Sequence, residues 1–110
     1  MLKRQLKYNE EVAEIPFTLF DASYAGLAGA MRRLLKDGAD PDQTDAFGWT
    51  PLMYATYGGH SGAVAVLLAE GADTDVEVAG MTPLAWAQEK GHDAVAEVLR
   101  AAAERLSHRL

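Results

Sequence analysis

The feature of this 110-residue sequence that most limits its fold is an internal repeat. The pentapeptide GWTPL at 48–52 recurs as GMTPL at 80–84. The tripeptide GAD at 71–73 has an earlier copy at 38–40. The pentapeptides are separated by 32 positions and the tripeptides by 33, so the two repeat distances differ by one residue. A nearly constant period of this length predicts stacked units, each too small to bury its apolar face without its neighbours.

We expect a single domain made of a leader and three units, at 1–16, 17–44, 45–76 and 77–110. In the central unit, Thr50 can cap a helix that has Pro51 at its first position. Gly58 and Gly59 are expected to end this helix through positive backbone angles. A second helix then buries Ala63, Val64, Leu67 and Leu68 and is closed by Gly71. Both helices are too short to be stable in isolation.

The outer units are expected to contain similar helix pairs. In the first unit, helices over 18–24 and 29–37 point Met31, Leu34 and Leu35 inward. The last helix is expected to have Asp93 as its N-cap and a surface pair of Arg100 with Glu104. Its apolar stripe consists of Val95, Val98, Leu99, Ala102, Leu106 and Leu110. The leader is interpreted as a short helix over the first unit, with a charged binding tail as the alternative.

The repeated motifs resemble the ankyrin repeat, a β-turn followed by two antiparallel helices. The resemblance rests on GxTPL, the GH pairs at 59–60 and 91–92, the LL pair at 67–68 and the closing GAD. It covers about residues 17–103 and implies an all-α solenoid of helix-turn-helix units with projecting β-hairpin loops. Met53 and Ala85 stand where the family usually has His. The outer units depart most from the pattern and are interpreted as caps.

The resemblance also implies a partner-binding surface, on the concave side and at the hairpin tips. Carried over position by position, the set is Tyr24, Ala46, Phe47, Trp49, Tyr57, Val78, Ala79, Met81, Glu89 and Lys90. Because aromatic side chains dominate binding hot spots, four of these are expected to form one apolar strip: Phe47, Trp49, Tyr57 and Tyr24. The alternative for Trp49 is packing on Pro51 or a neighbouring hairpin. Tyr54 and Trp86 are assigned to the core.

The charge distribution narrows the choice of partner. The net charge is -6, and the stretch from Asp37 to Glu89 holds nine acidic residues with no Lys or Arg. Acidic loops repel phosphate backbones and attract basic protein surfaces, so we expect a protein partner with a basic patch and no nucleic acid. The alternative is that these charges serve only solubility. The apolar run 63–69 is too short to cross a membrane, and the cysteine-free composition is compatible with the cytoplasm, where we expect the protein.

No pattern in the sequence predicts a catalytic, cofactor or metal site. His60 and His92 occupy equivalent positions, where the resemblance makes them hydrogen-bonding residues between loops. The segment that begins with Asp40 and Asp42 resembles the start of a calcium-binding loop, but it lacks the glycine and the glutamate that such a loop needs further on. We therefore expect a non-enzymatic interaction module, acting as an adaptor, inhibitor or regulator and as a monomer rather than a homodimer. The alternatives are a structural subunit of an oligomer and, less favoured, a metal-binding protein or enzyme.

Overall fold

The computed structural model describes residues 17–109, although not the side chains of 106–109. The predicted leader over 1–16 and the predicted roles of the Leu106 and Leu110 side chains lie outside this part. The helices of the described part are α2 (Leu19–Ala25), α3 (Ala28–Lys36), α4 (Pro51–Tyr57), α5 (Ser61–Ala69), α6 (Pro83–Lys90) and α7 (Asp93–Arg109). The positions at which one unit passes into the next, around residues 44 and 76, stay a prediction.

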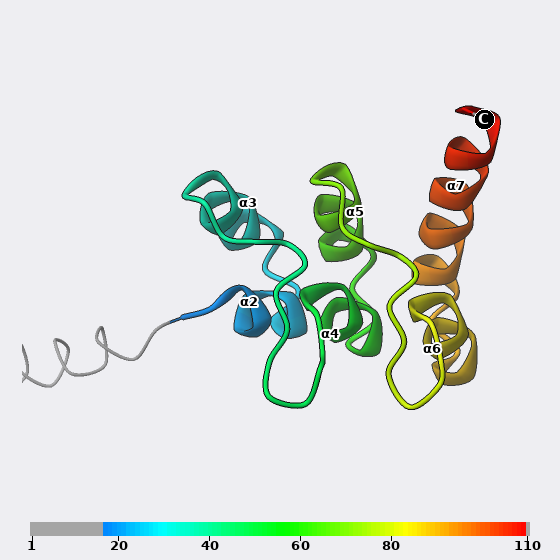
Figure 1. Ribbon diagram of the computed structural model, residues 1–110, viewed down its shortest axis with the longest axis horizontal. Coiled ribbons are helices and arrows are strands. Elements are labelled where there is room, and N and C mark those ends of the chain that lie inside the picture. Colours follow the sequence, from blue (N-terminus) through cyan, green and yellow to red (C-terminus); the bar gives the residue numbers. More distant parts are fainter. Residues whose placement is uncertain (1–16, 110) are drawn as a thin grey trace, which may run out of the picture.

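The helices of the described part form two parallel layers, as the solenoid interpretation requires (Figure 1). Helix α4 packs between α2 and α6 in one layer, and α5 lies between α3 and α7 in the other. The loops that lead into α4 and α6 extend beyond the layer of α2, α4 and α6 (Figure 1). Within residues 17–109 the only β-pairing is an isolated bridge between Val78 and Met81, so these hairpins are too short to make strands. The all-α class is confirmed.

A threonine cap starts the first helix of each unit. The side chains of Thr18, Thr50 and Thr82 accept hydrogen bonds from the backbone N–H three residues on, and Thr18 also forms a capping box with Asp21. These contacts satisfy donors that the first helical turn leaves free. Thr50 thus confirms its predicted role, and Thr18 lies just before the helix that was expected to include it.

Three local predictions are wrong. Gly58 has a φ of -75° and continues the right-handed geometry of α4, so Gly59 alone supplies the positive φ. Asp93 is the first residue of α7 rather than its cap, which places its carboxylate in the first turn, where the helix dipole favours it. Arg100 pairs with Glu97 at 3.3 Å instead of with Glu104, because residues three apart also lie on one helix face.

The core runs along the seam between the two layers. Its largest fully buried apolar side chains are Leu19, Met31, Leu52, Met53, Val64, Leu67 and Val95. Most inward-facing predictions are confirmed, while Leu34, Leu68 and Val98 are half-buried. Met53, which replaces the family's usual His, is 1% exposed and adds apolar volume to the core.

Candidate partner-binding surface

Six aromatic side chains form a continuous group that we call the aromatic cluster: Phe20, Tyr24, Trp49, Tyr54, Tyr57 and Trp86. Trp49 lies at its centre, with ring centroids 5.0 Å from Tyr54, 5.6 Å from Tyr57 and 6.2 Å from Trp86. These separations are typical of favourable aromatic pairs. The cluster therefore joins α2, α4, α6 and the loop that leads into α4.

Helical and repeat spacing explain why these rings meet. Tyr54 and Tyr57 are three residues apart on α4 and share one face, as do Phe20 and Tyr24 on α2. Trp86 is the counterpart of Tyr54 one unit later, at the same shift that relates GMTPL to GWTPL. Since α4 packs against both α2 and α6, its aromatic face meets the rings of both neighbours.

The cluster is open to solvent, although unevenly. Tyr24 is 55% exposed and Tyr57 is 37% exposed, whereas Trp49 is half-buried among its neighbours. Phe47 is 83% exposed at the tip of the central hairpin and has no ring within stacking distance among the described residues. Of the four aromatic residues expected to form one strip, Trp49 and Tyr57 are in direct contact. Tyr24 is connected to them through Tyr54, which contacts both Tyr24 and Trp49, whereas Phe47 lies apart from the other rings.

The assignment of Tyr54 and Trp86 to the core is wrong, because both side chains are half-buried members of the surface cluster. Each uses its polar atom to hold a hairpin against the first helix of its own unit. The hydroxyl of Tyr54 donates to the carboxylate of Asp45, and Nε1 of Trp86 donates to the carbonyl oxygen of Val78 at 3.0 Å. A repeat pattern identifies the equivalent positions but does not reveal this polar role.

Asp45 organises the hairpin that carries the central aromatic residues. Its Oδ1 accepts hydrogen bonds from the backbone N–H groups of Phe47 and Trp49, at 2.9 and 3.0 Å. Its backbone N–H also donates to the carbonyl oxygen of Trp49 at 3.0 Å. Because Tyr54 holds the other carboxylate oxygen, the loop and α4 are linked through one side chain. Asp45 thereby fixes the position of Trp49.

This link shifts the pKa values of both partners. The pKa of Asp45 is lowered from its ordinary value of 3.8, mainly because its carboxylate accepts the hydrogen bond from Tyr54. The same hydrogen bond is the main reason why the pKa of Tyr54 is raised from 10.0 to about 12. A lowered Asp pKa stabilises the fold above about pH 4 and loses this effect as the pH falls through the lowered value. A raised Tyr pKa stabilises the fold below pH 10 and loses its effect as the pH rises from 10.0 towards 12.

We expect Tyr54→Phe to lower the free energy of unfolding at pH 7 by about 1 kcal/mol, because it removes one partly solvated hydrogen bond to a carboxylate. The variant should also lose the Tyr54 part of the stability decline above pH 10. Urea denaturation at neutral and alkaline pH measures both effects. Tyr24→Phe is the matched control, since its ring stays in the cluster and its hydroxyl has no hydrogen bond among the described residues. Equal pH profiles for the two variants would contradict the assignment.

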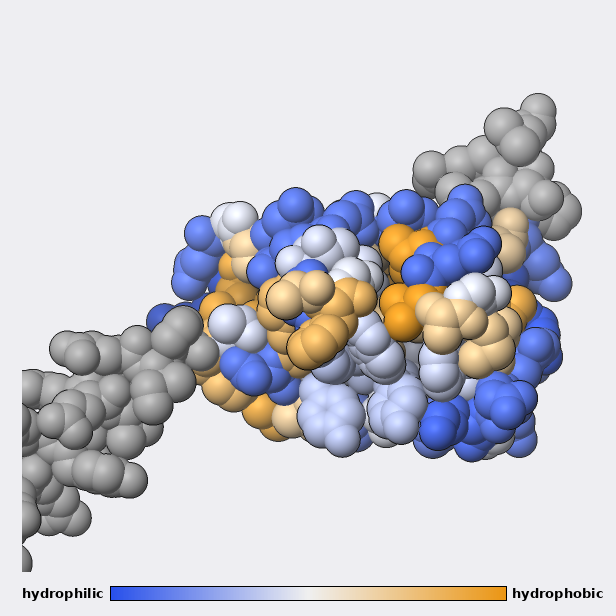
Figure 2. Space-filling view, turned by 60° about the horizontal axis from the view of Figure 1, so that its bottom comes forward, coloured by the Kyte–Doolittle hydropathy of each residue, from blue (hydrophilic) through white to orange (hydrophobic). Residues whose placement is uncertain are grey.

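The hairpin that leads into α6 carries three more of the expected contact residues, Val78, Ala79 and Met81. Val78 and Met81 exchange backbone hydrogen bonds at 3.0 and 3.1 Å across a turn in which Ala79 has a φ of 55°. Ala79 is exposed, while Val78 and Met81 are half-buried. Ala46, in the corresponding part of the central hairpin, is also exposed. Figure 2, turned towards the projecting loops, shows two apolar patches separated by less apolar and hydrophilic residues.

The end of α6 contributes charge at the edge of the cluster. Glu89 and Lys90 are both exposed, and Nζ of Lys90 lies 4.6 Å from the centre of the Tyr57 ring. This geometry is that of a cation–π contact. One ring face of the cluster thus already accommodates an ammonium group.

The two equivalent histidines connect neighbouring units. Nε2 of His92 lies 3.1 Å from the carbonyl oxygen of Tyr57, a distance at which the protonated ring nitrogen donates a hydrogen bond. The ring of His60 lies against Gly26 and Gly58. The expected hydrogen bond between loops is therefore confirmed for His92, and His60 makes a packing contact with the preceding unit.

Two further observations concern other classes of site. Among the described side chains, those of residues 17–105, no three of His, Asp or Glu lie close enough together to hold a metal ion. No helix in this same part combines the length and apolarity that crossing a bilayer requires.

A comparison with models of protein families identifies the family to which the fold belongs. A family model described as ankyrin repeats, in three copies, matches residues 19–107. The chain belongs to the ankyrin-repeat family. Ankyrin repeats are generally protein–protein interaction modules and typically not enzymes, and their stacked units create extended binding surfaces. A search of curated proteins found no significant match to this ankyrin-repeat chain.

Proposed function

We propose that this ankyrin-repeat protein binds another protein through the aromatic cluster and the two hairpin tips, as an adaptor, inhibitor or regulator. The contact set is the one expected from the sequence: Tyr24, Ala46, Phe47, Trp49, Tyr57, Val78, Ala79, Met81, Glu89 and Lys90. Tyr54 and Trp86 support it by holding the two hairpins in place.

The observation that carries this proposal is the exposure of large aromatic surface on connected, rigid elements. Tyr24, Phe47 and Tyr57 are each more than a third exposed, and the two tyrosines belong to the continuous cluster. Rigid rings lose little conformational entropy when they are buried in an interface. Exposed apolar side chains on a pre-organised surface are therefore well suited to act as binding hot spots.

We propose a partner surface that is basic. The loops that lead into α4 and α6 carry exposed carboxylates at Asp42, Asp73, Asp75 and Glu77, and Glu89 adds another at the end of α6. Complementary charge accelerates association and makes it sensitive to salt. Binding that is independent of ionic strength would contradict a basic partner but leave the aromatic contacts in place. We further propose that the protein acts as a monomer in the cytoplasm.

We expect the double variant Trp49→Ala, Tyr57→Ala to weaken partner capture by at least about 100-fold, because it removes the centre of the cluster. Affinity capture followed by mass spectrometry identifies candidate partners, and titration with each purified candidate measures the loss. The far-ultraviolet circular dichroism should remain helical, since neither ring is buried in the core. The single variant Phe47→Ala tests the contribution of the hairpin tip.

Phe17→Ala is the matched aromatic control. Phe17 is 52% exposed, precedes α2 and has no ring contact among the described residues. A partner that is retained by Phe17→Ala and lost by the double variant supports the proposed surface. A partner that is retained by both variants at wild-type affinity would exclude the aromatic cluster as its binding site.

A further inference from the structure

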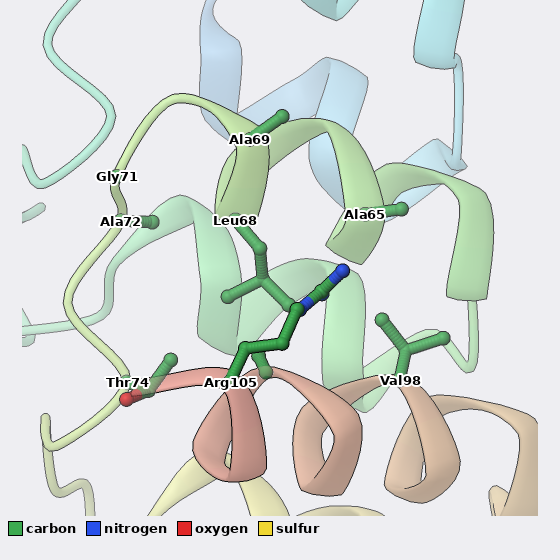
Figure 3. Close-up of a pocket in the computed structure, with 9 residues that line it drawn as sticks. Ala65, Leu68, Ala69, Gly71, Ala72, Thr74, Val98 and Arg105 are labelled. Atoms are coloured by element: carbon green, nitrogen blue, oxygen red, sulfur yellow. The ribbon is translucent and has the colours of Figure 1, made fainter. Parts of the chain in front are cut away.

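An open apolar groove with a volume of about 540 Å³ lies between α5 and α7, in the layer of helices that does not carry the aromatic cluster. The α5 wall presents Ala65, Leu68 and Ala69, and the α7 wall presents Val98, Ala102 and Arg105 (Figure 3). Gly71, Ala72 and Thr74, from the loop after α5, also line the groove. The volume falls in the range of sites that bind ligands or partner side chains.

Comparison of equivalent positions explains why this groove is open. Ala65 and Ala69 occupy the places that Arg32 and Lys36 occupy in α3, one unit earlier. Long side chains at such positions can cover neighbouring apolar surface with their methylene groups, whereas alanine cannot. The outer side of α5 is therefore left uncovered, and Leu68 is only half-buried in the groove.

The apolar surface extends beyond the groove on both helices. The sequence of α5, SGAVAVLLA, contains no charged residue, and Ala65 and Ala69 are exposed. On α7, Ala94 and Ala101 are exposed and share a helix face with Val98, from which they are four and three residues apart. A surface helix usually carries polar residues on its solvent side. An apolar outer face next to an apolar groove is instead typical of a surface that another molecule covers.

The walls of the groove suit a helix. Ala65 and Ala69 are four residues apart on one wall, and Val98, Ala102 and Arg105 follow at helical spacing on the other. Small side chains allow the backbone of a third helix to approach closely. A helix that docks in this way contributes apolar residues at i, i+3, i+4 and i+7. The stretch from Val98 to Arg105 corresponds to about two helical turns of contact.

The charges next to the groove are mostly negative. Four exposed carboxylates adjoin its lining along the chain: Glu70, Asp73, Asp75 and Glu104. None of the four has an ion pair among the described side chains, where the only ion pair joins Arg100 and Glu97. Arg105 is the one cation in the lining. Helix α5 separates the groove from the exposed cations of α3, which are Arg32, Arg33 and Lys36. A docked helix is therefore surrounded by an excess of negative charge.

We propose that this groove binds a basic amphipathic α-helix of another protein. The apolar residues of that helix lie between α5 and α7, and its Lys and Arg side chains complement the carboxylates of Glu70, Asp75 and Glu104. The groove and the aromatic cluster lie in different layers, so the chain has two separate binding surfaces, and both attract positive charge. This second surface goes beyond the function proposed above.

A designed peptide pair tests this proposal without a known partner. Both fluorescent peptides have about 15 residues, with leucine at i, i+3, i+4 and i+7. Lys fills the other positions of one peptide, and Glu those of the second. Fluorescence anisotropy with the full chain should show that the Lys peptide binds at least about tenfold more tightly than the Glu peptide, with a preference that decreases as salt is added. Equal binding of both peptides, or no binding of either, would overturn the proposal.

A charge variant tests whether the carboxylates beside the groove cause this preference. The triple variant Glu70→Gln, Asp75→Asn, Glu104→Gln removes three charges and changes no core residue. It should weaken binding of the Lys peptide at least about tenfold. Asp73 is left unchanged because its Oδ1 accepts a hydrogen bond from the backbone N–H of Asp75 at 2.9 Å.

The control for this variant removes the same number of charges elsewhere. Asp37→Asn, Glu77→Gln, Glu89→Gln changes three exposed carboxylates that do not adjoin the groove lining. The two triple variants have the same net charge, so they attract a basic peptide equally at long range. The control should weaken binding of the Lys peptide by no more than about twofold. Equal losses in both variants would show that the peptide responds only to net charge, which would overturn the proposal.

A variant that fills the groove tests the docking position separately from charge. Ala65→Gln adds a long uncharged side chain to the α5 wall and should weaken binding of the Lys peptide at least about tenfold. Ala103→Gln, at an exposed position of α7 outside the groove lining, is the matched control and should bind like the wild type. Equal affinities of the two variants for the Lys peptide would contradict docking between α5 and α7.

Arg105 provides a test of the opposite sign. Its side chain reaches from α7 into the space between the two helices (Figure 3). Because it is a cation in the lining, it opposes a basic ligand. Arg105→Gln should therefore strengthen binding of the Lys peptide about threefold. Unchanged or weaker binding would overturn the proposed chemistry of the ligand.

Two other results would also show that the proposal is wrong. If sizing and sedimentation reveal a dimer that Ala65→Gln dissociates, the groove is occupied by a second copy of this chain. If the double variant Trp49→Ala, Tyr57→Ala loses the Lys peptide, the peptide occupies the aromatic cluster instead of the groove. The expected result is wild-type affinity of this double variant for the peptide. Failure of the groove experiments leaves the aromatic surface untouched, because the groove variants lie on the other layer.

Discussion

Leu67→Ala is expected to lower the free energy of unfolding by about 3 to 4 kcal/mol. Leu67 is 0% exposed on α5, which packs against α3, α4 and α7. The substitution removes buried methyl groups and leaves a cavity between the central unit and its neighbours. Since a three-unit solenoid is stabilised by contacts between units, the loss should reduce the stability of all three.

Urea denaturation followed by circular dichroism and by tryptophan fluorescence measures this effect. Trp49 and Trp86 report on the loops and helices of the second and third units, whereas circular dichroism reports on every helix. We expect the two probes to shift together to lower urea. Leu27→Ala is the matched control, because Leu27 is 46% exposed and should contribute less than about 1 kcal/mol. Similar losses for the two leucines would contradict the packing argument.

The fold could be predicted from the sequence because its determinants are local and repeated. Threonine followed by proline specifies a capped helix start, and apolar residues at helical spacing, such as Ala63, Val64 and Leu67 of α5, specify a buried stripe. Neither signal depends on distant residues. Recurrence of these signals at a nearly constant spacing then leaves stacking as the arrangement that buries all the apolar faces at once.

The candidate surface could be predicted only in part. The expected set contains Trp49 and Tyr57, which are in contact, but the sequence pattern misplaced Tyr54 and Trp86 in the core. Their roles depend on hydrogen bonds to Asp45 and to the Val78 carbonyl, which exist only once each hairpin has folded against its helix. Two large aromatic residues at equivalent positions were the available signal, because tyrosine and tryptophan usually need a polar partner when they are partly buried.

The repeat pattern alone also does not predict the apolar groove between α5 and α7. Its walls are formed by Ala65, Leu68 and Ala69 of α5 and by Val98, Ala102 and Arg105 of α7. An alignment of the units reveals that Ala65 and Ala69 replace Arg32 and Lys36. Whether that replacement opens a groove or is filled by closer packing depends on the distance between α5 and α7. That distance depends on the side chains of both helices, which include Val98 and Ala102 of the third unit. Predicting the groove therefore requires the side-chain volumes on both helices and the distance between them.

The second large effect is expected for Gly59, the second of the two glycines that follow α4. Gly59 and Gly91 are counterparts with φ angles of 75° and 72°, so alanine at either position is strained by about 1 kcal/mol. They differ in their surroundings. A Cβ at Gly59 would lie 2.8 Å from the ring of His92, whereas a Cβ at Gly91 would meet nothing within 4 Å. Gly91→Ala thus measures the backbone strain without a steric clash.

We expect Gly59→Ala to cost about 3 kcal/mol and Gly91→Ala about 1 kcal/mol, both measured by urea denaturation. The additional loss arises because the new methyl group displaces His92, which then loses its hydrogen bond to the Tyr57 carbonyl. His92→Ala should remove the clash, so the double variant with Gly59→Ala should be less destabilised than the sum of the two single variants by about 2 kcal/mol, the part of the Gly59→Ala loss that depends on His92. Strict additivity would show that His92 moves away without cost. Coupling of the expected sign would establish that His92 positions its unit by packing over Gly59 of the unit before it, as the ring of His60 lies over Gly26 one unit earlier.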